Sequence, residues 1–152
     1  MAAPVTIDSI YTYVYYLFKP LKVTDVRLDI KAENLGRNNN NISLVCRYSV
    51  EKGWYEFNIA SNGLWWIKRY DPRFNNYTDI GKGASRLINL GQATNEYGAV
   101  CKDNKLTLFI NGKEVRTLTD NTLVNGQVGF SVSSFNVTPV TVALDYFKIS
   151  VP

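Results

Sequence analysis

The chain has 152 residues, of which 45% are hydrophobic and 20% charged, a composition typical of a folded globular domain. It contains no histidine, which excludes Ser-His and Cys-His nucleophiles and histidine metal sites. The net charge of +4 comes from basic residues scattered along the chain, with Lys68-Arg69 as the longest run, so no nucleic-acid partner is expected. The longest apolar run, Tyr11 to Phe18, is far shorter than the ~20 residues of a membrane span.

The first 22 residues form a tyrosine-rich segment whose residues 11–18 are apolar or aromatic at both alternating sets of positions. A strand of this kind is expected to be buried on both faces. One alternative is that a long loop of the same domain covers its outer face. The other is that it pairs with a neighbouring copy, which would give a homo-oligomer or a filament subunit of a cell-surface assembly.

The following segments alternate apolar and polar residues with the two-residue period of strands. Val26 to Glu33 is the first, and the Gly36 to Asn41 tract then turns the chain. Three short strands are predicted next, at residues 42–49, 54–60 and 64–70, and they form a meander because Gly-containing turns separate them.

Residues 71–92 are polar and irregular and are predicted to form the longest loop. A second meander follows at residues 97–102, 106–110 and 114–118, and strands at 127–133 and 140–149 close the domain. About ten to twelve strands without a helix bury their apolar faces by stacking two sheets or closing a barrel. We predict one all-β domain over residues 1–152.

Five stretches carry a resemblance to a known family: CRY at 46–48, WYEFNIASNGLWWI at 54–67, AVCKDNKLTLFINGKEV at 99–115, NGQVGF at 125–130 and VALDYFKI at 142–149. They resemble the concanavalin A-like, laminin-G-like sandwich domains of bacterial surface and secreted proteins. The resemblance implies a two-sheet antiparallel jelly-roll β-sandwich and an extracellular or cell-surface location. Members of the family range from sugar-binding modules to glycoside hydrolases, so the fold alone leaves the function open.

Hydrolases of this family carry acidic residues in the pattern E-x-D-x-x-E, so that the side chains project together into the groove. This sequence has no such triplet, and the nearest approach is Glu56 alone. We therefore predict a protein that is not an enzyme and has no cofactor.

Strand alternation predicts which side chains share the open face of the first meander. If Tyr55, Phe57 and Ile59 point into the core with Leu44, Cys46 and Tyr48, the opposite face carries these candidate ligand-binding residues: Arg47, Trp54, Glu56, Asn58, Trp66, Lys68 and Tyr70. Flat aromatic rings beside planar hydrogen-bonding groups suit a glycan. The competing interpretation is a structural face covered by the 71–92 loop, with Glu56 paired to Arg47 or Lys68.

Calcium binding is another property that the resemblance implies. Residues Asp71, Asn75 and Asp79 offer oxygen donors in the predicted loop, although Ca²⁺ needs about 6–8 oxygens.

Cys46 and Cys101 lie centrally in separate predicted strands. They are either free buried thiols or a disulfide between strands or sheets, and we favour the disulfide. A disulfide would place the protein outside the cytosol, in agreement with the resemblance.

Overall fold

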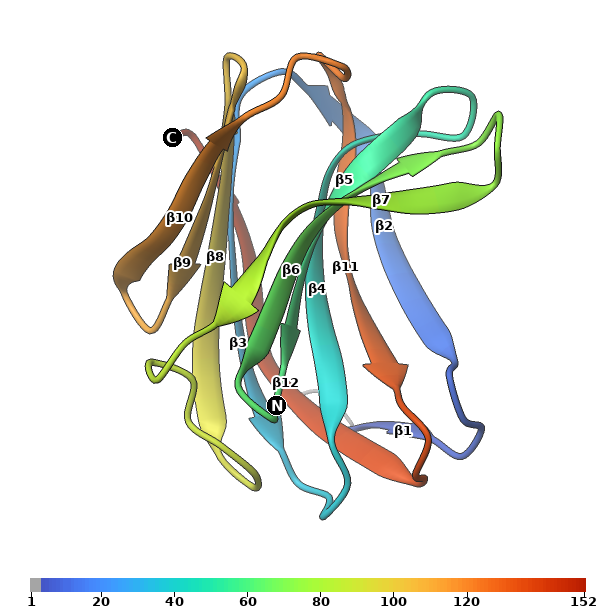
Figure 1. The fold of residues 1–152 in the computed structure, drawn as a ribbon, viewed down its shortest axis with the longest axis vertical. Coiled ribbons are helices and arrows are strands. Elements are labelled where there is room, and N and C mark those ends of the chain that lie inside the picture. The colour runs from blue at the N-terminus through green and yellow to red at the C-terminus, as the bar shows by residue number, and fades with distance from the viewer. Residues whose placement is uncertain (1–3) are drawn as a thin grey trace.

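A computed structural model describes residues 4–152, and every regular element in this range is a β-strand. Two six-stranded antiparallel sheets stack face to face (Figure 1). The prediction of an all-β, two-sheet sandwich is confirmed. Residues 4–152 hold no helix long and apolar enough to span a membrane.

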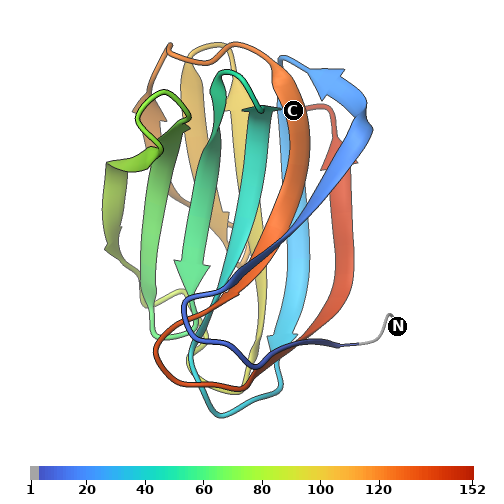
Figure 2. The ribbon, with the colours of Figure 1, turned by 90° about the vertical axis from the view of Figure 1, so that its right-hand side faces the viewer.

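The first sheet has the order β1-β12-β3-β8-β9-β10. Its strands, in that order, are Val5–Ile7, Val140–Ser150, Val26–Asn34, Thr94–Lys102, Lys105–Ile110 and Lys113–Thr119. The second sheet has the order β2-β11-β4-β5-β6-β7. Its strands are Tyr13–Val23, Gly126–Ser134, Asn40–Ser49, Gly53–Ala60, Leu64–Asp71 and Asn76–Ala84. The strands of both sheets run roughly along the long axis of the molecule (Figure 2).

Both predicted meanders are present, as β4-β5-β6 and β8-β9-β10. The inner face of β5 carries Tyr55, Phe57 and Ile59, all completely buried. Trp65 and Ile67 of β6 also lie in the core. The predicted strand parity therefore holds for β5 and β6, because one face of each packs on the opposite sheet.

The core is also crossed by a disulfide between Cys46 of β4 and Cys101 of β8. These strands belong to different sheets, so the bond joins the two layers of the sandwich. Both cysteines are completely buried.

Strand β4 departs from the predicted parity at Arg47. Cys46 pairs with Tyr55 and Ser49 with Gly53, so β4 contains one more residue than β5 over this stretch. Arg47 is the bulged residue, with a φ of 52°. The extra residue reverses the side-chain alternation. As a result Arg47 points inward and Tyr48 lies beside Trp54 on the outer face, the opposite of the sequence prediction.

A glycine on the neighbouring strand accommodates this bulge. A Cβ on Gly126 of β11 would lie 2.4 Å from the Arg47 carbonyl carbon and 2.5 Å from the Tyr48 nitrogen. No other residue type fits this close approach.

The predicted loop at residues 71–92 is also wrong in part, because its centre forms the edge strand β7. Gly81 and Gly83 of β7 face the core, where added Cβ atoms would lie 2.9 Å from Leu118 and 2.8 Å from the Trp65 ring. The sequence of β7 lacks the apolar–polar alternation expected of a strand, because its inward residues are small and its outward ones are polar. Its backbone hydrogen bonds come from pairing with β6. The β6–β7 hairpin reaches away from the body at the upper right of Figure 1.

The tyrosine-rich segment forms β1 and the edge strand β2, and residues 1–3 lie outside the described range. β2 pairs only with β11 among the described strands. It is not buried on both faces: Tyr13, Tyr16 and Phe18 are each between 41% and 48% exposed.

Candidate functional site

The outer face of the second sheet brings together most of the predicted ligand-binding residues. Cross-strand register places Trp54 opposite Tyr70, Glu56 opposite Lys68, and Asn58 opposite Trp66. These six side chains alternate with the core residues of β5 and β6, so they share the outer face. Arg47 is the exception.

Glu56 lies at the centre of this face and is only 1% exposed. Its Oε1 accepts hydrogen bonds from the Tyr15 hydroxyl at 2.7 Å and from Trp54 Nε1 at 3.1 Å. Its Oε2 accepts one from Asn58 Nδ2 at 2.8 Å, and the Asn58 carbonyl accepts one from Ser43. The predicted ion pairs with Arg47 or Lys68 are not among those of residues 4–152, where Lys68 pairs with Asp79 at 3.6 Å. Neutral donors therefore satisfy this buried carboxylate.

Four tyrosine rings surround Trp54. Trp54 stacks on Tyr70 with centroids 4.3 Å apart and packs against Tyr48 at 4.9 Å. Tyr15 and Tyr77 meet it edge-on, at 6.3 Å and 6.2 Å. Because β4 and β6 flank β5, Tyr48 and Tyr70 approach Trp54 from its two sides. We refer to these five residues as the Trp54 cluster.

The hydroxyls near Glu56 act as donors at neutral pH. Burial, and then the negative charge of Glu56, raise the pKa of Tyr15 and the pKa of Tyr77 above the ordinary tyrosine value. The two hydroxyls also hydrogen-bond each other at 2.8 Å. Hydrogen bonds among Tyr15, Tyr77, Trp54 and Glu56 therefore hold the side chains of the Trp54 cluster together.

Trp66 is arranged differently from Trp54. No aromatic ring pairs with it among the described residues, and Lys68 Nζ lies 5.8 Å from its ring centroid. Trp66 lines an open hollow of about 410 Å³ together with Leu64, Lys82 and Gly83.

Leu64 also lines a second hollow, of about 450 Å³. Its lining residues are Asn62, Gly63, Leu64, Ala84, Ser85, Arg86, Ile88 and Leu90. The two hollows together are lined by apolar residues and by cationic and amide groups. This combination is the one that small-ligand sites usually show.

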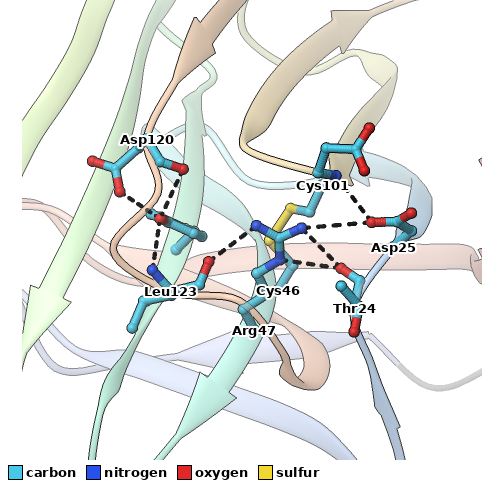
Figure 3. The surroundings of a disulfide bond; sticks show 9 residues. Thr24, Asp25, Cys46, Arg47, Cys101, Asp120 and Leu123 are labelled. Carbon is cyan, nitrogen blue, oxygen red and sulfur yellow. Dashed lines mark hydrogen bonds and ion pairs between the residues drawn. A yellow bond between two sulfur atoms is a disulfide. The ribbon is translucent and has the colours of Figure 1, made fainter.

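Arg47 has a structural role between the sheets (Figure 3). It is 1% exposed and donates to the Thr24 carbonyl through Nε and Nη2, at 3.1 and 3.0 Å. Its Nη1 donates to the Leu123 carbonyl at 3.0 Å, and Asp25 lies 3.7 Å from Nη2. The prediction that Arg47 lies on the ligand face is therefore wrong, because the bulge turns its side chain inward.

Besides Tyr48, which the sequence analysis placed in the core, three residues of this face were missed: Tyr15, Tyr77 and Lys82. Tyr15 lies on β2, three strands from Glu56, and Tyr77 and Lys82 lie on β7, which the sequence pattern did not reveal. Their distance along the chain left no local signal beyond the richness in tyrosine.

The three calcium candidates are engaged by protein groups. Asp71 accepts from the Arg73 side chain, Asn75 accepts from the Tyr70 hydroxyl, and Asp79 pairs with Lys68. No cluster of three or more acidic, cysteine or histidine residues suited to a metal occurs within residues 4–152. Calcium binding stays a prediction.

No family model matches the chain, and no curated protein matches it. Solved structures do. The carbohydrate binding module CBM66 from Bacillus subtilis is 13% identical with a TM-score of 0.66, over 99% of this chain and 83% of that one. Sheep galectin-11 is 12% identical with a TM-score of 0.61, over 93% and 98%. The Bacillus licheniformis beta-glucanase is 9% identical with a TM-score of 0.63, over 99% and 92%.

These similarities confirm the predicted concanavalin A-like jelly roll of the lectin–glucanase type. Binding modules, a galectin and a glucanase all share it, so the fold admits both binding and hydrolysis.

Proposed function

We propose that the protein binds glycans without hydrolysing them, and that Trp66 is the principal contact. The observation that carries the proposal is the difference between the two outer-face tryptophans. Rings of the Trp54 cluster enclose Trp54, whereas Trp66 borders an open hollow and stacks on no ring of residues 4–152. A pyranose ring presents an apolar face to an aromatic ring and hydroxyls to its surroundings. Lys82 and Asn62 then supply donors at the edge of the sugar.

The carbohydrate-binding module and galectin of the same fold support this proposal. The sequence adds no catalytic constellation. Glu56 lies at the centre of the outer face, and both of its oxygens are hydrogen-bonded by protein side chains. Asp79, its neighbour two strands along, is paired with Lys68. Turnover in a reducing-sugar assay over β-glucans, lost in Glu56→Gln, would contradict the non-catalytic part.

The binding part is tested on a glycan array with Trp66→Ala. Loss of one aromatic contact at the centre of a site lowers affinity by about tenfold or more. Phe74→Ala is the matched control, because Phe74 is an aromatic residue 71% exposed on the β6–β7 turn, outside the hollow. Equal signals from wild type and Trp66→Ala would refute the assignment.

An extracellular location belongs to the same proposal. The disulfide between Cys46 and Cys101 supports it, because such bonds form and persist in oxidising compartments.

A second candidate function is self-assembly through β2. Within residues 4–152 this strand is at the edge of its sheet, and Tyr16 and Phe18 on it are 41% and 48% exposed. Tyr16 stacks on Phe130, which packs on Phe147, so an apolar surface continues from β2 onto β12. Lys19, Pro20 and Lys22 would restrict strand addition to residues 13–18. A monomer in light scattering at high concentration would eliminate this candidate.

A further inference from the structure

The centre of the outer face contains polar side-chain atoms without hydrogen-bond partners. Asn41 Oδ1, Ser131 Oγ and Ser133 Oγ are buried and unpaired in the part of the chain that the structure describes. Both serines are completely buried, and Asn41 is 4% exposed. Ser133 is opposite Asn41 in the register of β11 and β4, and Ser131 is opposite Ser43. The unpaired atoms therefore form one continuous strip, which we call the serine strip.

The rings of Tyr13 and Tyr15 cover this strip. In the register of β2 and β11, Tyr15 is opposite Ser131 and Tyr13 is opposite Ser133. The two rings are stacked, with centroids 5.9 Å apart. Because β11 and β4 lie between β2 and β5, the Tyr15 side chain, which starts beside Ser131, extends over these strands toward Glu56.

These unpaired groups lower the stability of the folded state. A buried hydroxyl with no partner lowers stability, and an alanine in its place would remove that penalty without leaving a significant cavity. Groups that lower stability and are nevertheless present mark positions that serve another purpose. The cover is also attached to an edge strand, and Tyr13 is 43% exposed, so the outward path of the two rings is open.

We propose that Asn41, Ser131 and Ser133 form a second subsite for a neutral sugar unit, and that Tyr15 occupies it from within the chain until the sugar displaces it. The inference rests on the proposed glycan binding and extends the site from Trp66 across the sheet. Hydroxyls both donate and accept, so a sugar satisfies the serine hydroxyls and the amide carbonyl at once.

The chemistry of Glu56 selects the ligand class. An ionised carboxylate only accepts hydrogen bonds, and Tyr15 is one of its donors. A sugar hydroxyl takes over that donation when Tyr15 leaves, whereas the carboxylate of an acidic sugar would repel Glu56 in a poorly solvated position. The second subsite therefore takes uncharged sugar units.

The proposal requires opposite effects on stability and on binding. Ser131→Ala with Ser133→Ala removes two unpaired hydroxyls, so the melting temperature rises while affinity falls by about fivefold or more. Ser134→Ala is the matched control on the same strand. The Ser134 hydroxyl is buried but fully engaged, donating to the Ser9 carbonyl and accepting from the Thr12 amide. We expect this control to have a lower melting temperature and an unchanged affinity.

Tyr15→Phe tests the cover itself. It retains the ring and removes the hydroxyl that holds it to Glu56, so a larger fraction of molecules has the strip open. Only molecules in which the strip is open can bind the sugar, so the apparent affinity rises with their fraction. Because a hydrogen bond to a charged acceptor is strong, its loss is expected to raise the apparent affinity by about tenfold.

Affinities are measured by titration calorimetry with β-linked tetrasaccharides of glucose, galactose and N-acetylglucosamine, beside a tetrasaccharide that contains glucuronate. Weaker binding by the serine double variant, tighter binding by Tyr15→Phe and preference for uncharged probes support the second subsite. A double variant that binds like wild type, while Trp66→Ala binds weakly, overturns the subsite and leaves the proposed function standing. No binding of any probe by wild type or Tyr15→Phe overturns both.

Discussion

Replacing Arg47 by methionine separates the structural role of this residue from the ligand-binding role that strand alternation predicted. Methionine keeps most of the apolar stem and removes the guanidinium, which donates three hydrogen bonds to backbone carbonyls. The bond to Leu123 is buried, and the unpaired carbonyl left behind costs about 1–3 kcal/mol. The two bonds to Thr24 are partly buried and together contribute about 1–2 kcal/mol.

The two contributions sum to about 2–5 kcal/mol, and we expect a loss of about 3 kcal/mol in the free energy of unfolding, because water can still hydrate the partly buried Thr24 carbonyl. For a chain of this size each kcal/mol lowers the melting temperature by roughly 2–4 °C. We therefore expect a decrease of roughly 6–12 °C in differential scanning calorimetry, with glycan affinity unchanged below the transition. Arg37→Met, at an exposed arginine, is the control and is expected to change stability by less than about 0.5 kcal/mol. A loss below about 1 kcal/mol, or a selective loss of affinity, would refute this account of Arg47.

Three further predictions concern the stability of the sandwich. Cys46→Ala with Cys101→Ala opens a loop with a sequence separation of 55, which by chain entropy lowers stability by about 4 kcal/mol; an unchanged urea midpoint would contradict the disulfide. Burial opposes ionisation of Asp120, but hydrogen bonds from Tyr55 and Thr122 outweigh it and hold the pKa of Asp120 below its ordinary value. Its stabilisation is therefore present above about pH 4 and lost as the pH falls through the lowered pKa, and Asp120→Asn should flatten melting temperature against pH between about 5 and 2. Gly83→Ala places a Cβ 2.8 Å from the buried Trp65 ring and should cost about 1–3 kcal/mol in chemical denaturation, whereas wild-type stability would show that the ring moves freely.

The predicted and observed sites agree where the evidence is local. Trp54, Glu56 and Asn58 share a face because strand side chains alternate, and the same rule holds for Trp66 on β6. Alternation does not say which of these residues is accessible. Trp54 and Glu56 are enclosed by tyrosines from β2, β4, β6 and β7, so the open part of the face lies at Trp66 instead.

The amino-acid sequence by itself determined the fold class, both meanders and the inward set of Tyr55, Phe57 and Ile59, because the period of a strand is written in consecutive residues. Only the tertiary structure decided that Arg47 turns inward, since the bulge depends on Gly126 on a strand that is distant in sequence. It also decided that Tyr15 reaches Glu56 across two intervening strands. Sheet order and register come from pairing between remote segments, and no window of neighbouring residues contains that information.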